Sequence, residues 1–293
     1  MVIGLVSMGY LSKRAKLLSQ RHADAMLNVV LYVLLPLSVL GTYAQVNVPQ
    51  AGLYVIAAGA ACNVIGLIAA TRVAKKLTTD KGKEGALVLA VSTMNSGLLG
   101  LAVGRLLFDE LGVLTVLLLD LPNAFYTIVI GKAIASRYGS RERTDSVQRR
   151  LVSFLATPYL YGVILGMLHN RGIVVMPAGI LEIIPPISSL ASFATLFAMG
   201  IYLSFSMNHR LETSSALLLR FGTGLFVFIV VMFLTPTLTY FPSGPLFYAC
   251  TLPPAIMILA HSRAHGLDID LAAEVLSVSL LLSVLEAIVL VLL

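Results

Sequence analysis

The stretch Asn95-Ser96-Gly97-Leu98-Leu99-Gly100 lies in the middle of an apolar run, and Leu252-Pro253-Pro254 lies in the middle of another. Glycine and proline weaken or break a helix. Backbone that leaves the helical ladder inside a bilayer must find hydrogen-bond partners in neighbouring protein or in a water-filled cavity, because hydrocarbon offers none. Paired breaks, one in each half of the chain, therefore predict a membrane transporter.

Composition places the chain in a membrane. Its 293 residues are 58% hydrophobic and only 12% charged, and no polar stretch is long enough to form a soluble domain. The formal net charge of +6 comes from basic residues that flank the hydrophobic runs, so it reflects topology and predicts no nucleic-acid partner. Cys62 and Cys250 fall inside apolar runs, where a thiol usually behaves as a small hydrophobic group.

Ten apolar segments are candidates for transmembrane helices. They lie at 1–11, 25–43, 50–71, 86–104, 111–131, 151–168, 178–206, 213–236, 245–261 and 271–293. The first segment reaches only about 16 Å at about 1.5 Å per residue, which is half of a bilayer core. We attribute its short length to a missing N-terminal stretch.

The basic loop 132–150 divides these segments into five in residues 1–131 and five in residues 151–293. Because five is an odd number, the second half is expected to be inverted relative to the first, with a repeat axis in the membrane plane. The fourth and ninth segments, which carry the breaks, then correspond to each other. The predicted fold class is an all-α membrane protein of ten transmembrane helices in two inverted five-helix repeats, with broken helices 4 and 9.

The basic residues also predict the orientation of the chain. If the first segment enters from outside, Arg105 and Arg171 are the only Lys or Arg residues at the outer ends of segments. Lys and Arg are retained on the cytoplasmic side of membrane proteins. We therefore expect a multi-pass protein of the cell membrane, plasma or inner, with basic loops in the cytoplasm and both termini outside.

Five stretches resemble the auxin efflux carrier family, which includes microbial organic-acid permeases. In chain order they are Leu27-Asn28-Val29-Val30-Leu31-Tyr32-Val33-Leu34-Leu35-Pro36, Asn95-Ser96-Gly97-Leu98-Leu99-Gly100-Leu101, Thr157-Pro158 with Gly162 and Gly166, Phe197-Ala198-Met199-Gly200, and Leu252-Pro253-Pro254-Ala255 followed by Asp268, Leu271 and Ala272. Each motif alone is weak, but five in the family's order, over essentially the whole chain, are specific. Ala102 stands where the family usually has proline, so the first break is expected to be less sharp than the second.

The resemblance implies the fold of bile acid sodium symporters and sodium/proton antiporters, with a scaffold bundle and a mobile bundle that contains the crossed helices. It implies transport of a small organic anion across the lipid bilayer, with proton or sodium coupling that differs between members and with no bound cofactor. Proteins of related fold often dimerise through the scaffold, so a homodimer is implied as well. The short middle loop resembles that of a microbial member.

The chemistry at the crossing follows from the interrupted helices. Each interruption leaves unpaired N–H groups at one helix start and unpaired C=O groups at another helix end, worth about half a charge of each sign. A carboxylate suits the N–H ends. Asn95 has a compatible alternative role as a cap that satisfies its own backbone. The predicted substrate-binding residues are Asn95, Ser96, Gly97, Gly100, Pro253 and Pro254, together with Asn28 on the segment that resembles the family's substrate-proximal helix.

Acidic and basic residues within the segments are the next candidates. Asp120 lies near the centre of the fifth segment, where a buried carboxylate costs several kcal/mol unless it is paired, hydrated or protonated. We hypothesise that Asp120, with Asn123, binds a proton or a cation during the transport cycle. The alternative is a structural carboxyl that bonds Asn123 or backbone freed by Pro122. Arg220 is expected to snorkel to the cytoplasmic interface, and Glu286 is expected to be structural.

Signatures of other protein classes are missing. An intramembrane enzyme would need a nucleophile with a base, paired catalytic aspartates or a His-Glu-x-x-His motif, and the sequence has none of them. His261 and His265 are four residues apart but have no obvious third ligand, so we predict solvated side chains and no metal site. A channel would need rings of pore-lining groups.

We predict an alternating-access carrier of a small organic carboxylate. One alternative is a sodium-coupled symporter of the bile-acid type, whose cation would bind carbonyls freed at the crossing. The other alternative is a non-transporting membrane receptor.

Overall fold

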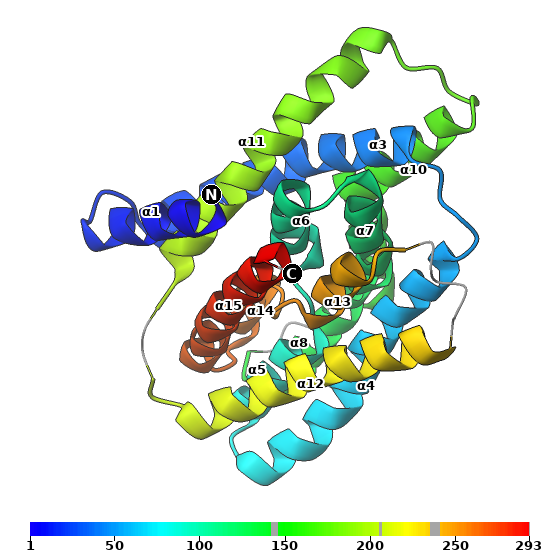
Figure 1. Cartoon of the computed structure of the whole chain (residues 1–293). Coiled ribbons are helices and arrows are strands. Elements are labelled where there is room, and N and C mark those ends of the chain that lie inside the picture. The colour runs from blue at the N-terminus through cyan, green and yellow to red at the C-terminus, as the bar shows by residue number, and fades with distance from the viewer. Residues whose placement is uncertain (142–145, 205–206, 235–240, 293) are drawn as a thin grey trace.

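The computed structural model describes residues 1–141, 146–204, 207–234 and 241–292, and all regular elements in this part of the chain are helices. Figure 1 shows α3, α4, α11 and α12 at the edges of the molecule, around a centre that contains α6, α7 and α13. In chain order the elements are α1 (Val2–Arg14), α2 (Gln20–Val29), η1 (Val30–Leu34), α3 (Leu35–Gln45), α4 (Gly52–Leu77), α5 (Lys81–Ser92), η2 (Ser96–Gly100), α6 (Leu101–Leu107), α7 (Glu110–Phe125), η3 (Tyr126–Gly131), α8 (Lys132–Tyr138), α9 (Val147–Leu155), α10 (Pro158–Asn170), α11 (Ala178–Tyr202), α12 (Arg210–Leu234), α13 (Ser243–Thr251), α14 (Met257–His265) and α15 (Ile269–Leu292), where η denotes a π-helical turn.

Local sequence explains where several helices begin and end. Asp80 caps α5 by accepting a 3.0 Å hydrogen bond from Lys83 N, and Asp109 caps α7 in the same way. Pro158 occupies the first turn of α10, where its missing N–H costs nothing. Gly266 ends α14 with a φ of 73°, a left-handed conformation that glycine adopts without a steric penalty.

Membrane-crossing length is reached by seven of the described helical segments, and the pair α9 and α10, bent by 49°, makes an eighth if it is one crossing. The seven are Gln20–Gln45, Gly52–Leu77, Lys81–Leu107, Glu110–Tyr138, Gly179–Tyr202, Arg210–Leu234 and Ile269–Leu290. By contrast, α1 has 13 residues, and α13 and α14 have 9 residues each. The prediction of a multi-pass, all-α membrane protein is thus confirmed, while helix length alone supports seven or eight crossings.

Close helix contacts sort the described helices into two bundles. In the first bundle (α1, α2, η1, α3, α10 and α11), α1 packs on α11 and α10 packs on α3. Glycines bring the backbones together: a Cβ on Gly9 would lie 2.0 Å from Phe197 O, and a Cβ on Gly162 would lie 2.4 Å from Pro36 O. In the second bundle (α4 to α8 and α12 to α15), α4 packs on α5 and α7, and α12 packs on α4 and α13.

The two segments with predicted breaks lie inside the second bundle. In Lys81–Leu107, 94% of an apolar stretch of 18 residues is buried inside the protein, whereas in Arg210–Leu234 the buried share of such a stretch is 22%. Irregular backbone is tolerated at membrane depth only in such an enclosed position. The first break leaves residues 93–95 outside a helix, between α5 and η2, whereas the second leaves residues 252–256 outside a helix, between α13 and α14. The first break is therefore the milder one, as the alanine at position 102 predicts.

Candidate functional site

The two breaks touch each other directly. Asn95 N donates a 2.8 Å hydrogen bond to Pro253 O, so the backbone of one interrupted segment is satisfied by the backbone of the other. A second hydrogen bond runs in the opposite direction, from Ala255 N to Thr93 Oγ1 at 3.3 Å. Residues far apart in the chain are therefore joined by two hydrogen bonds, and we call the place where the two breaks meet the crossing.

Two asparagines satisfy the remaining backbone of the first break. Asn123, on α7, accepts a 3.0 Å hydrogen bond from Met94 N and donates a 2.8 Å hydrogen bond to Met94 O. Asn63, on α4, donates a 2.7 Å hydrogen bond to Ser92 O and a 3.1 Å hydrogen bond to Asn123 Oδ1. These neutral amides replace the intrahelical partners that are lost where α5 ends.

Asp120 joins the same network. Ser96 Oγ donates a 2.5 Å hydrogen bond to Asp120 Oδ1, and Asn123 Nδ2 approaches that oxygen to 3.1 Å. Gly97 is equally close, since a Cβ at this position would lie 3.0 Å from Asp120 Oδ2. Asp120 is only 3% exposed, and no ion pair involves it within the described ranges. A carboxyl group is thus enclosed next to the start of η2 without a cation to balance its charge.

The second break is held by a buried arginine. Arg220 is 1% exposed; its Nε donates to Leu252 O at 2.9 Å, and its Nη2 donates to Cys250 O at 2.7 Å. Our expectation that Arg220 snorkels to the cytoplasmic interface is therefore wrong. The physical reason is that the end of α13 leaves carbonyls without partners at this depth, and the guanidinium binds two of them.

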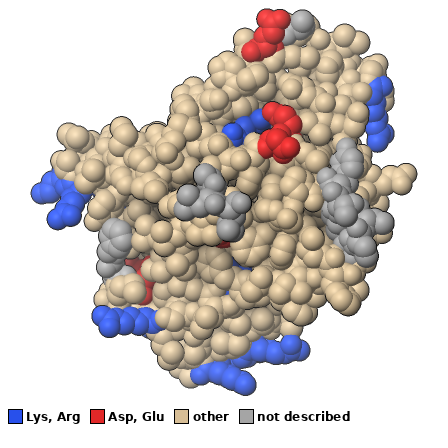
Figure 2. All heavy atoms as spheres, viewed as in Figure 1, with Lys and Arg blue, Asp and Glu red and all other residues tan. Residues whose placement is uncertain are grey.

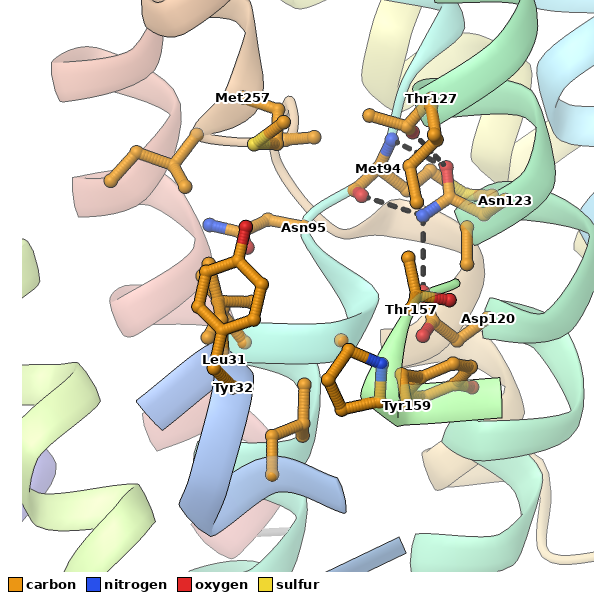
Figure 3. A pocket seen from close by; sticks show the side chains of 18 residues that line it. Leu31, Tyr32, Met94, Asn95, Asp120, Asn123, Thr127, Thr157, Tyr159 and Met257 are labelled. Carbon is orange, nitrogen blue, oxygen red and sulfur yellow. Dashed lines mark hydrogen bonds between the residues drawn. The ribbon is translucent and has the colours of Figure 1, made fainter. Parts of the chain in front are cut away.

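A cavity of about 180 Å³ lies beside the crossing. Its polar side chains include Asn95, Asp120 and Asn123, and the rest of the lining is largely apolar. Figure 3 shows Asp120 and Asn123 together on one wall, while the side chain of Asn95 extends toward Leu31 and Tyr32 on the other. The amide of Asn95 and the network of Asp120 thus line the same cavity.

Comparison with known proteins shows the family of this chain. A family model described as membrane transport protein matches residues 1–291. The chain belongs to this family, the auxin efflux carriers. It is 24% identical over 303 residues to an uncharacterized transporter of Methanocaldococcus jannaschii, a match that covers 97% of the chain and 94% of the relative. It is 23% identical over 294 residues to an uncharacterized transporter of Methanothermobacter thermautotrophicus, covering 97% of the chain and 93% of the relative.

In this transporter the predicted site residues fall into three groups. Asn95, Gly97, Asp120 and Asn123 line the cavity at the crossing. Ser96, Gly100, Pro253 and Pro254 are buried beside it and belong to the two breaks. Asn28 is exposed and lines a different cavity, of about 520 Å³, together with Asp24, Arg141 and Arg263. The structure therefore gathers all of the predicted residues except Asn28 at the crossing.

Several polar residues near the site escaped sequence reasoning. Thr157 and Tyr159, at the start of α10, line the cavity of the transporter, and Thr127 does so from η3. The Thr157-Pro158 motif was a usable signal, since it marks a helix start that faces the crossing. The contacts of Asn63 with the first break depend on which helices are neighbours, so no local signal marks them.

The two histidines near the end of α14 are also placed differently from the prediction. His261 is 7% exposed and His265 is 1% exposed, so neither is solvated. His261 Nε2 lies 3.1 Å from Thr127 O, because α14 packs against η3 and α8. Among the described residues no group of three potential ligands is placed to hold a metal ion.

Proposed function

We propose that this transporter is a secondary carrier for a small organic carboxylate, which binds where the two breaks meet and crosses the membrane by alternating access. The observation that carries the proposal is the pair of hydrogen bonds between Asn95 and Pro253 and between Thr93 and Ala255, next to a largely apolar cavity that also contains a few polar side chains. Interrupted helices that meet around a cavity at mid-depth are how many secondary transporters bind their substrate.

Matched contacts support ten crossings in two inverted repeats. A Cβ on Gly66, in α4, would lie 2.8 Å from Val91 O, just before the first break. A Cβ on Gly224, in α12, would lie 2.2 Å from Cys250 O, just before the second break. Likewise, α1 packs on α11 while α10 packs on α3, as expected if the first and sixth segments correspond and the second and seventh do as well. In this arrangement residues 1–131 and 151–293 are the repeats, and 132–150 is the loop between them.

The same repeat explains the distribution of charge. Figure 2 shows blue spheres at the left and lower edges of this face, with smaller blue groups at its upper right edge and near its upper centre, and tan spheres over most of the surface between. Basic residues close α1 and α4 at one side, including Lys13, Arg14, Lys75 and Lys76. We assign that side to the cytoplasm, which leaves both termini outside the cell membrane.

Substrate and proton are expected to bind together. A carboxylate in the cavity would accept hydrogen bonds from the Asn95 amide and from the start of η2, where the helix dipole favours negative charge. An ionised Asp120 in the same cavity would repel it, because both charges would share a site that excludes most water. Protonation of Asp120 removes this repulsion, so the proposal includes proton symport with Asp120 as the proton carrier and Asn123 as its partner.

Sodium coupling has less support at this site. That alternative needs backbone carbonyls freed at the crossing to bind a cation. Arg220 occupies Cys250 O and Leu252 O, and Asn95 N occupies Pro253 O. These three carbonyls of the second break therefore already have donors.

Flux measurements on the protein in liposomes test the proposal. Labelled acetate, lactate, succinate and malate would be offered with a proton gradient, with the gradient collapsed, and with or without sodium. We expect saturable flux of at least one anion that falls when the gradient is collapsed and does not depend on sodium. Sodium-dependent flux would instead support the bile-acid-type symporter, and binding without flux would support a receptor.

Asp120→Asn tests the coupling. In the wild type, flux should rise as the pH falls, because substrate binds with the protonated carboxyl. The variant cannot ionise at this position, so its flux should lose this pH dependence. Asp109→Asn, which changes a cap of α7 at the surface, is the matched control and should keep it. Full transport with unchanged pH dependence in Asp120→Asn would contradict the coupling. The homodimer that the family resemblance implies stays a prediction, which cross-linking in the same liposomes tests.

A further inference from the structure

Four cavities follow one another from one side of the transporter to the other. The cavity of about 520 Å³ near Arg263 shares Leu31, Ile256 and Met257 with the cavity at the crossing. The crossing cavity shares Leu35, Gly97 and Leu98 with a narrow space of about 20 Å³. That space in turn shares Arg105, Ser188 and Ser192 with a cavity of about 190 Å³. The last of these, which we call the outer cavity, lies on the side that the proposed orientation assigns to the outside.

Arg105 stands between the narrow space and the outer cavity. It is near the end of α6, in the second bundle, and its side chain is 16% exposed. Its Nη2 donates to Ser38 O at 2.9 Å and to Thr42 Oγ1 at 2.5 Å, both on α3 in the first bundle. A guanidinium has five N–H donors, so these two contacts leave donors for another group.

Ser188 offers a second polar group in the same place. Its side chain, on α11, is 2% exposed, and its hydroxyl has no hydrogen-bond partner. A buried hydroxyl without a partner costs free energy. Ser188 lines both the narrow space and the outer cavity, beside Arg105. A mostly enclosed cation and an unsatisfied hydroxyl therefore face one small space.

Glu110 is the charged group that competes for this arginine. Glu110 Oε2 lies 3.9 Å from Arg105 Nη1, which is too long for a direct hydrogen bond. The side chain of Glu110 is 58% exposed, so the attraction is screened by solvent and is weak. A carboxylate inside the cavity would approach the guanidinium from its enclosed side and could take over this role.

We propose that Arg105 and Ser188 form an outer docking site for the carboxylate of the transported anion, separate from the site at the crossing. The guanidinium binds the carboxylate by charge-assisted hydrogen bonds, and the Ser188 hydroxyl donates a further one. Glu110, an exposed residue of the outer cavity, opposes binding because its carboxylate attracts the same guanidinium. This inference rests on the proposed function, since its ligand is the anion that the protein carries.

The test compares the two faces of the membrane. Uptake into intact cells that overproduce the protein reports substrate capture from outside, and uptake into inside-out vesicles from the same cells reports capture from inside. The probe is whichever of labelled acetate, lactate, succinate or malate gives the highest flux. Arg105→Gln should raise the outer half-saturating concentration about tenfold, and Ser188→Ala about threefold, as expected for losing a charged or a neutral hydrogen bond.

Glu110→Gln is the decisive variant, because it should strengthen capture. We expect its outer half-saturating concentration to fall about threefold as the competing charge disappears, with the inner value unchanged. Arg171→Gln is the matched control: this exposed arginine lies at the same predicted side, after α10, and lines none of the four cavities, so neither value should move.

Two results would overturn the docking site. One is an outer half-saturating concentration that Glu110→Gln and Ser188→Ala leave at the wild-type value. The other is an equal change at both faces, which would indicate a general loss of folding and would be visible in the melting temperature of the purified variants. If none of the four anions is carried by the wild type, the proposed function itself fails, and the two failures are thus distinguished.

Discussion

At the two breaks of this transporter, different kinds of side chain form hydrogen bonds with backbone groups that have lost their intrahelical partners. The first break is served by neutral amides, Asn63 and Asn123, in a network that also holds the carboxyl of Asp120. The second is served by the guanidinium of Arg220, a permanent charge that binds two carbonyls. In the proposed mechanism the first break changes its protonation through Asp120, while the second break keeps a permanent charge.

Glycine contacts are what the two breaks share. Gly66 lets α4 lie directly on the backbone that precedes the first break, and Gly224 lets α12 do the same at the second. In both places a helix of full membrane length supports a helix that ends inside the protein. The support is thus similar at the two breaks, while the polar groups that complete it differ.

The largest effect is expected from Arg220→Gln. The amide is shorter than arginine and cannot reach both Leu252 O and Cys250 O, so at least one buried carbonyl loses its partner. We expect the free energy of unfolding to fall by about 3 kcal/mol, in the range for breaking a buried charged contact. Thermal unfolding of the purified protein in detergent measures it.

Arg210→Gln, at the exposed first turn of the same helix, is the control and should leave the melting temperature unchanged. Arg220→Lys keeps the charge but presents one ammonium group in place of a planar fork, so an intermediate loss is expected. A wild-type melting temperature in Arg220→Gln would show that the guanidinium does not hold the second break.

Sequence reasoning found the breaks because their signals are local. Glycine and proline within apolar runs mark Asn95 to Gly100 and Leu252 to Pro254, and the pairing of Asp120 with Asn123 follows from a spacing of three along one helix. Each of these inferences needs only neighbouring residues. That the two breaks meet was an expectation from the family resemblance, which implies a mobile bundle containing crossed helices.

Sequence reasoning failed where the answer depends on which helices are neighbours. Arg220 was placed by its depth alone, which says nothing of the carbonyls of α13 across the helix interface. The same limit applies to Asn63, which reaches Ser92 from another helix, and to His261, which is covered by η3. Helices that are apolar on all sides carry little periodicity, so their facing cannot be predicted. Asn28 was assigned through a family motif, and it lines the cavity of about 520 Å³ near Arg263 instead.

The next largest effect separates the two glycine contacts. A Cβ at position 224 would come within 2.2 Å of Cys250 O, while one at position 66 would come within 2.8 Å of Val91 O. Backbone must shift in either case, and it must shift further at the second break. We expect Gly224→Ala to cost about 2 kcal/mol and Gly66→Ala about 1 kcal/mol of unfolding free energy, as for overpacking.

Gly222→Ala is a matched control in the same helix as Gly224, since nothing lies within 4 Å of a Cβ there. Alanine is the better helix former, so this variant should be neutral or slightly more stable. Equal losses in Gly224→Ala and Gly66→Ala would mean that the two breaks are equally rigid. A larger loss in Gly66→Ala would reverse the comparison.

The smallest effect concerns the contact that joins the breaks. Thr93→Val removes the hydroxyl that accepts from Ala255 N at 3.3 Å and that donates to Leu89 O at 2.8 Å, with almost no change in volume. Leu89 O keeps its backbone partner Thr93 N, so the main loss is the bond across the crossing. We expect a cost of about 1 kcal/mol, the usual net contribution of one hydrogen bond. Thr93→Ser keeps the hydroxyl and is the control.

A double variant tests whether the crossing couples the two breaks. If it does, Thr93→Val combined with Arg220→Lys should lower the free energy of unfolding by less than the sum of the single variants, because each loosens the same junction. Strict additivity in unfolding measurements would show that the breaks are held independently and that their contact is only a consequence of how each is supported.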